Sequence, residues 1–338
     1  MILIDAVYIN NSGGKALLDY FIEKIEETNF KIYYLLDSRI ISNHPIIKSS
    51  NKVRYLKGGF LPRYFFYMKN RILFSSIFCF GNFPPPIQQK SIVYTYFHQL
   101  LYINPSDDDG FYFNFMIKLK TSLFSLFSKN SNYWIVQTLL IKNSLNSKFN
   151  HISKSSIFVM PFYNITESNK IVIRISNKFL YVSTGFRYKN HYILISAFKN
   201  FFNKYKTGEL HLTIGNEYKN LIILINTLKL KGYPIFNLGI VNKFTLTHIY
   251  KSSEFVIFPS LRESFGLGIV EGIENGCKII ASDLPWLYSV CEPSLVFNPY
   301  SKISLEMAFE AAIYNKTKLS ISKVNNEIQE IIKLIGKN

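Results

Sequence analysis

The feature that most constrains this chain is a short apolar run followed at once by a glycine-rich segment, which together span Phe255 to Gly276. Phe255-Val-Ile-Phe258 has the composition of a buried strand, and Pro259 ends it because proline cannot donate to a strand ladder. The next residues predict a turn into a helix, with Ser264 capping one of the free N–H groups of the first helical turn. The segment therefore predicts a strand–turn–helix unit.

This unit would place two carboxylates near an anion-binding helix end. Glu263 lies in the predicted turn, and Glu271 lies about two helical turns further along the chain. Gly266 and Gly268 would let the backbone approach a group at the helix N-terminus, where N–H groups and the helix dipole favour negative charge. Such an arrangement suits a ligand that carries hydroxyl groups and a diphosphate, such as a nucleotide sugar.

The stretch resembles the signature of retaining glycosyltransferases of family 4, in which two Glu residues at a fixed spacing follow a strand that ends in Pro-Ser. Glu263 and Glu271 stand at those two positions, and Gly276 and a further predicted strand, Lys278 to Asp283, follow as in the family. An isolated pair of Glu at this spacing would more often be a surface pair beside a turn. The surrounding strand, turn and helix make the resemblance specific.

The resemblance implies a role for each residue of the motif. In the family the first Glu contacts the sugar hydroxyls and the second contacts the ribose, which assigns these roles to Glu263 and Glu271. Gly268 stands where the family often has Pro, and Gly272 where it usually has Ala. Neither departure removes a functional side chain. Backbone amides of the turn would hold the sugar and the diphosphate, so the donor-binding candidates here are Ser264, Phe265, Gly266, Leu267 and Gly268.

A second strand-to-helix turn offers positive charge. It follows the predicted strand Phe179 to Val182 and precedes a predicted helix from His191 to about Tyr205. Lys189 matches the lysine that holds the diphosphate in the family, whereas the usual partner arginine is missing from its place, and Arg187 is the candidate substitute. The alternative is a pair of solvated cations. Because a helix N-terminus disfavours cations, a bound anion explains them better.

Further candidates come from other loops. A turn at Asn10 to Gly14, before a helix from Lys15, has a double glycine, and Gly13 and Gly14 match a loop that in the family faces the donor diphosphate; a plain tight turn is equally compatible. His98 follows the predicted strand Ser91 to Phe97, at the strand end where ligands gather, and family members often carry a His there that contacts the donor sugar; a purely structural histidine is the alternative.

The sequence predicts a strand from Phe236 to Ile240 with Gly239 inside it. The resemblance implies that the loop after Gly239 borders the nucleotide base, with Val241 as the candidate contact. We assign Glu263, Lys189 and His98 as catalytic candidates. The donor-binding candidates are Gly13, Gly14, Arg187, Val241, Ser264, Phe265, Gly266, Leu267, Gly268 and Glu271.

The net charge of +17 favours an anionic partner. Between Arg39 and Ser106 the chain has no Asp or Glu, and its Lys and Arg residues alternate with Tyr and Phe. This mixture fits a membrane interface with anionic lipids, single-stranded nucleic acid, or a solvated basic face over an aromatic core. We predict contact with an anionic membrane surface and no nucleic-acid partner, because no nucleic-acid motif is present. Phe111 to Phe127 would be an aromatic helix that lies in the interface or packs internally.

No metal or cofactor is expected. Asp107-Asp-Asp-Gly110 has the acidic side chains that could bind a cation. Three acidic residues before Gly more often form a polar turn, and the resemblance implies that no metal is needed. Cys79, Cys277 and Cys291 lack metal-ligand spacing and are expected to be reduced. The start of the chain does not resemble a leader peptide, and no apolar run reaches the length of a membrane span, so we expect a cytoplasmic protein at the inner face of the cytoplasmic membrane.

Strands and helices alternate along the chain, which predicts an α/β fold with parallel sheets. The resemblance implies the GT-B architecture of two Rossmann-like domains facing across a cleft: an acceptor domain at residues 1–165, a donor domain at 166–322, and a final helix at 323–338 that crosses back to the first domain. The expected function is transfer, with retention, from a UDP- or GDP-linked sugar to a lipid-linked oligosaccharide in bacterial surface polysaccharide assembly. The alternatives are a sugar-nucleotide epimerase of the same fold and a non-catalytic nucleotide-sugar-binding protein.

Overall fold

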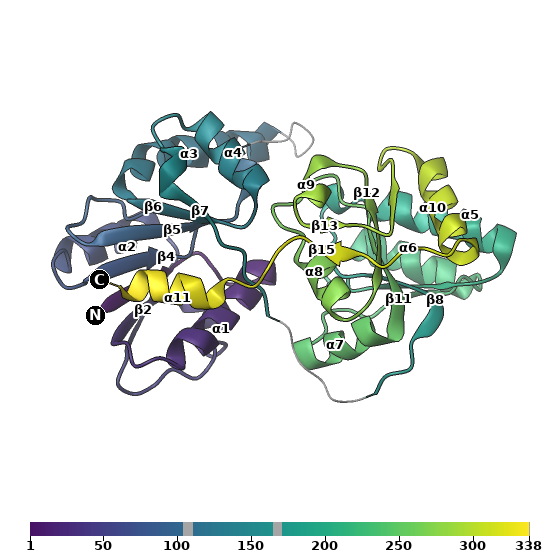
Figure 1. The fold of residues 1–338 in the computed structure, drawn as a ribbon, viewed down its shortest axis with the longest axis horizontal. Coiled ribbons are helices and arrows are strands. Elements are labelled where there is room, and N and C mark those ends of the chain that lie inside the picture. The colour runs from purple at the N-terminus through teal and green to yellow at the C-terminus, as the bar shows by residue number, and fades with distance from the viewer. Residues whose placement is uncertain (104–110, 165–170, 338) are drawn as a thin grey trace. The chain divides into compact units, whose positions relative to one another are not determined.

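The computed structural model describes residues 1–103, 111–164 and 171–337 of the chain. The chain forms two compact units, one made of Met1–Tyr163 with Asn325–Asn338 and one made of Asn164–Val324 (Figure 1). We call them unit 1 and unit 2. None of the helices in the described ranges combines the length and the apolar character that crossing a bilayer requires.

Unit 1 is built on a sheet of seven parallel strands in the order β3-β2-β1-β4-β5-β6-β7. The order reverses between β1 and β4, which places a topological switch point at their carboxyl ends. The strands are β1 (Ile2–Ala6), β2 (Ile32–Asp37), β3 (Lys52–Leu56), β4 (Ser76–Cys79), β5 (Ile92–Phe97), β6 (Tyr133–Val136) and β7 (Ile157–Val159). The α-helices are α1 (Ser12–Glu26), α2 (Phe60–Lys69), α3 (Phe111–Phe127), α4 (Leu139–Lys148) and α11 (Ile328–Gly336).

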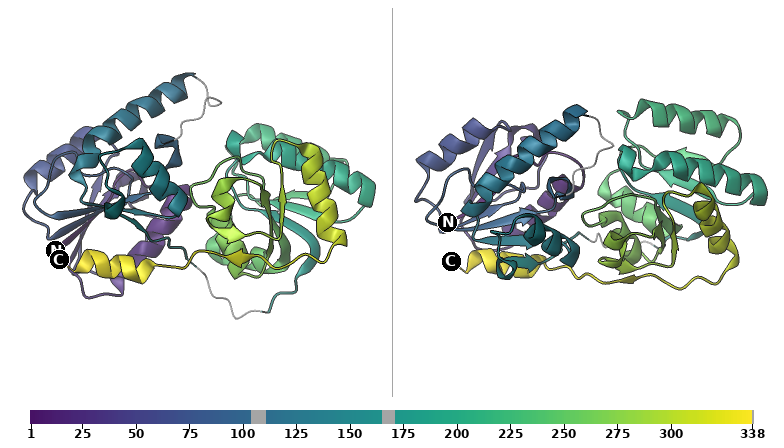
Figure 2. Two further views of the ribbon diagram at one scale, coloured as in Figure 1. Left: turned by 45° about the horizontal axis from the view of Figure 1, so that its top comes forward. Right: turned by 90° about the horizontal axis from the view of Figure 1, so that it is seen from above.

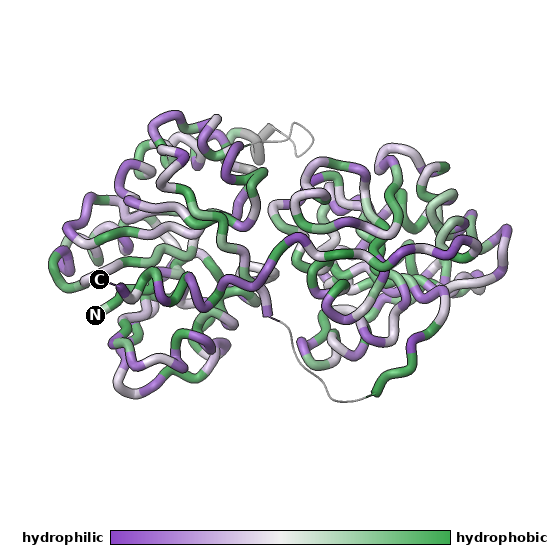
Figure 3. The backbone as a smooth tube through the Cα atoms, viewed as in Figure 1, coloured by the Kyte–Doolittle hydropathy of each residue, from purple (hydrophilic) through white to green (hydrophobic). Residues whose placement is uncertain are grey.

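The last helix of the chain, α11, packs on unit 1. Its apolar residues recur at helical spacing and are buried, and the backbone colour alternates along its turns in Figure 3. The Ser76 hydroxyl at the start of β4 donates to the carbonyl of Ile335 (2.7 Å), and the Asn326 amide donates to the carbonyl of Tyr163 (2.7 Å). These contacts fix the segment after Val324 to the first half of the fold.

A buried ion pair anchors α2 to the sheet of unit 1. Arg63 donates from Nε to Oδ2 of Asp5 (2.8 Å) and from its two terminal nitrogens to the carbonyls of Pro84 (2.8 Å) and Phe83 (2.7 Å). The Tyr67 hydroxyl donates to the same Asp5 oxygen (2.6 Å). Because both charges are buried but fully hydrogen-bonded, the pair ties a helix, a strand and a loop together.

Unit 2 has a sheet of six parallel strands in the order β10-β9-β8-β11-β12-β14. Counted along the chain, both sheets share the 3-2-1-4-5-6 order of the Rossmann fold. The strands are β8 (Ile175–Tyr181), β9 (Glu209–Leu212), β10 (Ile235–Asn237), β11 (Ser253–Phe258), β12 (Lys278–Ser282) and β14 (Leu295–Phe297), with a small antiparallel pair, β13 (Cys291–Glu292) and β15 (Ile321–Ser322). The α-helices are α5 (His191–Tyr205), α6 (Lys219–Leu230), α7 (Lys243–Ser252), α8 (Leu267–Glu274), α9 (Pro285–Tyr288) and α10 (Lys302–Tyr314).

The predicted α/β class with parallel sheets is confirmed, but three local predictions differ from the structure. Helix α1 begins at Ser12, so Gly13 and Gly14 lie in its first turn and not in the preceding loop. Strand β10 ends at Asn237, because Gly239 adopts φ +67 and turns the chain out of the extended conformation. Helix α2 and strand β4 were not predicted, because the segment from Arg39 to Ser106 was interpreted from its basic and aromatic composition and not from the spacing of its apolar residues.

Candidate functional site

The loop after β11 differs from the predicted turn in its cap. Gly266, and not Ser264, is the N-cap residue of α8, and it has left-handed backbone angles (φ +76, ψ 52) without a side-chain cap bond. Glycine reaches this conformation without steric cost, whereas Ser264 lies two residues too early to cap the helix. The expectation that Ser264 caps α8 is therefore wrong. The side chain of Phe265 is buried, so only its backbone could serve a ligand.

Helix α8 packs very closely on the sheet beneath it. A Cβ atom at Gly268 would lie 3.2 Å from the Tyr250 hydroxyl and 3.3 Å from the Phe258 ring. One at Gly272 would lie 2.8 Å from Val256 Cγ2. Gly272 therefore allows the approach of α8 to β11, and Gly268 allows its approach to Tyr250 of α7 and Phe258 of β11. These contacts give Gly268 a packing role, and its part in donor binding stays a prediction. This packing also explains why Gly replaces the larger residues that the family has at both positions.

Lys189 and Glu263 form an ion pair between the two predicted donor loops. Lys189 Nζ donates to Glu263 Oε1 at 2.5 Å, and both side chains are nearly nine-tenths buried. Lys189 ends a short 3₁₀ turn after β8, and Glu263 lies in the loop between β11 and α8. Because β8 and β11 are adjacent parallel strands, their carboxyl ends bring together residues that are far apart in sequence.

The neighbours of Lys189 keep it charged. Burial alone would lower its pKa, but the Coulombic attraction of Glu263 and the hydrogen bond to it outweigh burial, so the pKa of Lys189 is raised. Its ammonium also lies 5.3 Å from the Tyr188 ring centroid and 5.7 Å from that of Phe258. The Glu263 carboxylate thus balances the charge of Lys189 near the start of α5 without any bound anion. This is a second explanation for the presence of Lys189 at that position.

Arg187, the proposed substitute for the missing family arginine, begins the same 3₁₀ turn and is exposed. Asn190 follows the turn in a left-handed conformation and is the N-cap residue of α5. The side-chain amide of Asn190 donates to the carbonyl of Pro299 (2.9 Å), which fixes this turn against the loop after β14. The turn therefore holds Lys189 beside Glu263, whereas Arg187 lies at the exposed start of the turn.

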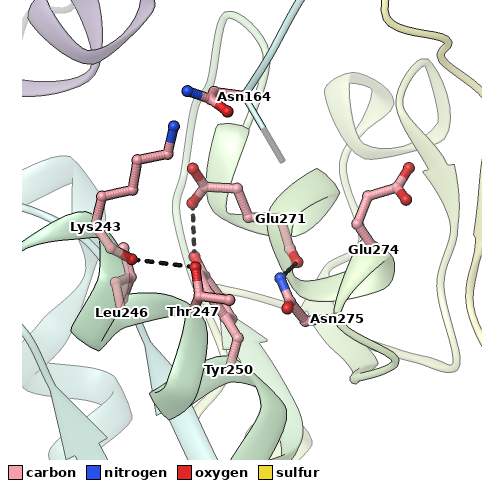
Figure 4. A pocket seen from close by; sticks show the side chains of 8 residues that line it. All are labelled: Asn164, Lys243, Leu246, Thr247, Tyr250, Glu271, Glu274 and Asn275. Carbon is pink, nitrogen blue, oxygen red and sulfur yellow. Dashed lines mark hydrogen bonds between the residues drawn. The ribbon is translucent and has the colours of Figure 1, made fainter. Parts of the chain in front are cut away.

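Glu271, on α8, lines a small pocket of unit 2 together with residues of α7 (Figure 4). The Tyr250 hydroxyl donates to Glu271 Oε2 (3.0 Å), and the side chain of Lys243 reaches over the same space. The pocket is a small hollow that is partly open to solvent. Its complete lining is Asn164, Lys243, Leu246, Thr247, Tyr250, Glu271, Glu274 and Asn275.

Burial raises the pKa of Glu271 to about 7, although the hydrogen bond from Tyr250 and the charge of Lys243 act in the opposite direction. A carboxyl group with this pKa can donate as well as accept a hydrogen bond near neutral pH. Val241, the predicted base contact, is two residues before Lys243 in the loop that leads into α7. Sequence reasoning missed Lys243 and Tyr250, since neither belongs to a motif, and only the helical spacing of α7 could have indicated their common face.

In unit 1 the structure brings Gly14 and His98 together. A Cβ atom at Gly14 would lie 3.7 Å from His98 Nε2, whereas Gly13 has open space around it. The backbone N–H of His98 donates to Asn82 Oδ1 (2.7 Å), and burial lowers the pKa of His98 to about 4, so its ring is neutral at pH 7. Its buried Nδ1 has no hydrogen-bond partner among the described residues. A neutral ring with a spare nitrogen can serve a ligand hydroxyl.

The described ranges contain no group of three or more His, Cys, Asp or Glu side chains placed to hold a metal ion. The candidate cation turn at 107–110 lies outside the residues that the structure describes. The three cysteines are free and buried.

Comparison with known proteins finds similarity to one curated sequence over most of the chain and to several solved structures. The chain is 22% identical over 294 residues to the O-antigen chain mannosyltransferase RfbU of Salmonella typhimurium, a match that covers 84% of this chain and 78% of that protein. Its fold is similar to that of sucrose-phosphate synthase from Thermosynechococcus elongatus (TM-score 0.72, 15% identity, 99% of this chain and 94% of that one). It is also similar to HepE of Anabaena, solved with UDP and glucose (TM-score 0.66, 14% identity, 99% and 95%).

These likenesses and the two Rossmann-type sheets confirm the GT-B fold class. The sequence model of the family described as Glycosyl transferases group 1 matches residues 150–321, which include Lys189, Glu263 and Glu271. Since the matched residues make up slightly more than half of the chain, the protein belongs to the glycosyl transferases group 1.

Proposed function

We propose that this glycosyltransferase is a retaining enzyme of family 4. It would move a sugar from a UDP- or GDP-linked donor to a hydroxyl group of a lipid-linked saccharide during assembly of a bacterial surface polysaccharide, such as O-antigen, lipopolysaccharide or capsule. The observation that carries the proposal is the Lys189–Glu263 pair beside the glycine-capped start of α8. RfbU, an O-antigen chain mannosyltransferase, and HepE, solved with UDP and glucose, support the choice of donor and pathway class.

In this proposal the pair binds both halves of the donor. Glu263 uses Oε1 for Lys189, and its Oε2, which has no partner among the described residues, accepts a sugar hydroxyl. Lys189 has three N–H donors and gives one of them to Glu263, so the others are available to the diphosphate. The first N–H groups of α8 add an electrostatic contribution. The ribose would occupy the pocket of Glu271 and Tyr250.

Catalysis then consists of positioning and charge stabilisation. The bond between the sugar carbon and the diphosphate oxygen breaks, and the diphosphate keeps the bonding electrons while Lys189 stabilises its charge. The acceptor oxygen bonds to the same face of that carbon, and its proton passes to the departing diphosphate. The proposal assigns no metal ion or cofactor, so a chelator should leave the rate unchanged. His98, Gly13, Gly14, Arg187 and Val241 remain proposed contributors.

A donor-consumption assay tests the proposal. The purified protein is incubated with UDP- and GDP-linked sugars and a lipid-diphosphate saccharide, and nucleotide release and the anomeric form of the product are measured. Glu263→Gln and Lys189→Met should each reduce transfer by at least about a hundredfold, the scale of losing one transition-state contact. The matched controls are Glu254→Gln and Lys278→Met, which alter another ion pair of unit 2 and should leave transfer intact.

Three results would contradict the proposal. An inverted product would remove the retaining assignment. Isomerisation of the donor without an acceptor would indicate an epimerase. Donor binding without turnover against any acceptor tried would indicate a binding protein. The cytoplasmic, membrane-associated location is part of the proposal, and fractionation of cells that express the tagged chain tests it.

A further inference from the structure

We propose that unit 1 binds an anionic phospholipid bilayer through the shared outer face of α2 and α3. We call this surface the α2–α3 face. It consists of two stripes of exposed apolar side chains, with cations around them. The α2 stripe is Leu61, Phe65, Met68 and Ile72, and the α3 stripe is Phe115, Leu119, Leu123 and Leu126.

The α2 stripe has the spacing of one helix face. Its members follow one another at intervals of four, three and four residues, and the last of them lies just beyond the end of the helix at Lys69. The opposite face of α2 supplies Arg63, Phe66 and Tyr67 to the core. Because the inner face already satisfies the packing of α2, the fold of unit 1 does not require the outer apolar residues.

The α3 stripe has the same character, with intervals of four, four and three residues. The inner face of α3 buries Ile117 and Phe124, and the Phe124 ring packs against Phe149 (4.8 Å between centroids) and Trp134 (5.3 Å). The eight side chains of the two stripes are between 38% and 80% exposed. Single exposed apolar residues are ordinary, whereas two ordered stripes indicate a surface that binds something.

The two stripes belong to neighbouring helices. The rings of Phe60, at the start of α2, and Phe127, at the end of α3, stack with their centroids 5.6 Å apart. In Figure 2 the two helices approach each other at these ends. The two stripes therefore lie on neighbouring helices that meet where these rings stack, and we treat them together as the α2–α3 face.

The charge around the face selects its partner. Six exposed cations lie on α2 and α3 or within a few residues of them, and none forms an ion pair with a described residue: Lys57, Lys69, Arg71, Lys118, Lys120 and Lys129. The sequence has no Asp or Glu from residue 38 to 106 or from 110 to 166. Apolar stripes with unpaired cations and no carboxylates match a bilayer interface that contains anionic lipids. An apolar protein groove would match the stripes but not the charge.

The link to a lipid-linked acceptor rests on the proposed function, but binding to the bilayer itself does not. The test is co-sedimentation of the purified chain with vesicles of phosphatidylcholine alone or with about one-third phosphatidylglycerol. We expect binding to the anionic vesicles that weakens, without vanishing, as salt shortens the screening length. A Phe65→Trp variant adds a reporter to two buried tryptophans, and brominated lipid should quench its fluorescence.

Two kinds of variant separate the contributions. Phe65→Ser with Leu119→Ser should weaken vesicle binding by about tenfold or more. Lys69→Glu with Lys118→Glu should weaken it at low salt by about a hundredfold, because each reversal removes an attraction and adds a repulsion. The matched control, Ile223→Ser with Leu230→Ser, changes exposed apolar residues of α6 in unit 2 and should bind as the wild type does. Circular dichroism and nucleotide binding should be unchanged in all three.

The proposal is overturned if the wild-type chain does not bind anionic vesicles, or if the stripe and charge variants bind them as strongly as the wild type. It is also overturned if the stripe variants convert a dimer to a monomer in light scattering while vesicle binding is unchanged, since the face would then join two copies. If vesicle binding follows the prediction but no nucleotide sugar is consumed, the proposed function fails and this inference stands.

Discussion

The contribution of the Lys189–Glu263 pair to stability can be isolated with a double-mutant cycle of Lys189→Met, Glu263→Gln and the combined variant. The two side chains are only 12% and 11% exposed, so water screens the pair weakly, and removing one partner leaves a charge without its counter-ion. We expect each single variant to lose about 3–5 kcal/mol of the free energy of unfolding. The combined variant should lose less than the sum, with a coupling energy of about 2 kcal/mol.

Urea unfolding followed by tryptophan fluorescence provides the assay. The chain has two tryptophans, Trp134 in unit 1 and Trp286 in unit 2, so a Trp134→Phe background leaves a reporter of unit 2 alone. Trp286 is suited to this role because its ring would lie 3.6 Å from a Cβ atom at Gly266, at the start of α8. The fluorescence of Trp286 therefore reports on the same part of the fold as the ion pair.

The control cycle uses Glu254 and Lys278, a pair in the same sheet at 3.1 Å whose side chains are 22% and 24% exposed. It should have a smaller coupling energy, below about 1 kcal/mol, because solvent screens this more exposed pair better than it screens Lys189 and Glu263. If the Lys189–Glu263 losses add within about 0.5 kcal/mol, the two residues are not coupled and the description of a buried pair is wrong.

Three further predictions concern other residues. Burial raises the pKa of Glu271 from 4.5 to about 7, so the stabilisation that the neutral carboxyl contributes is fully present below about pH 4.5 and is lost as the pH rises through 7. Glu271→Gln cannot ionise, so its free energy of unfolding should rise relative to the wild type by about 1–3 kcal/mol between pH 5 and 8. Urea unfolding across this pH range measures the difference, and a difference that stays constant with pH would refute the pKa shift. Gly266→Ala should cost about 1–2 kcal/mol in the same assay, because alanine resists φ +76, and an unchanged midpoint would exclude strain at that cap. Arg63→Met leaves Asp5 charged and buried and should cost about 3–5 kcal/mol, whereas the exposed Arg71→Met should be neutral; equal effects would contradict the buried pair.

Local patterns predicted the sheets and the motif unit well. The apolar run of β11 and the glycines after it are neighbours in sequence, so their strand–turn–helix form could be predicted without distant contacts. The N-cap residue of α8 could not be predicted in this way. The choice between Ser264 and Gly266 depends on where α8 packs against β11, and the close contact at Gly272 sets that position. Local patterns therefore gave the order of elements but not the last residues of each turn.

The ion pair and the pocket depend on contacts across the sheet. Lys189 and Glu263 are 74 residues apart, and only the pairing of β8 with β11 brings them together. Glu271 was predicted as a ribose contact, but its raised pKa follows from its burial beside Tyr250, which the sequence does not indicate. In α2, a composition rich in Phe and Tyr within a basic segment predicted membrane contact, but the helix that orders those residues was not predicted.

We propose that Lys189 and the start of α8 hold the diphosphate of a nucleotide sugar. The decisive experiment is a crystal structure of the protein with the nucleoside diphosphate or nucleotide sugar that binds it most tightly. We expect diphosphate oxygens within hydrogen-bonding distance of Lys189 Nζ, at about 2.7–3.2 Å, and of the first N–H groups of α8, with the ribose at Glu271. A diphosphate bound elsewhere, with the Lys189–Glu263 pair undisturbed and no contact to α8, would contradict it.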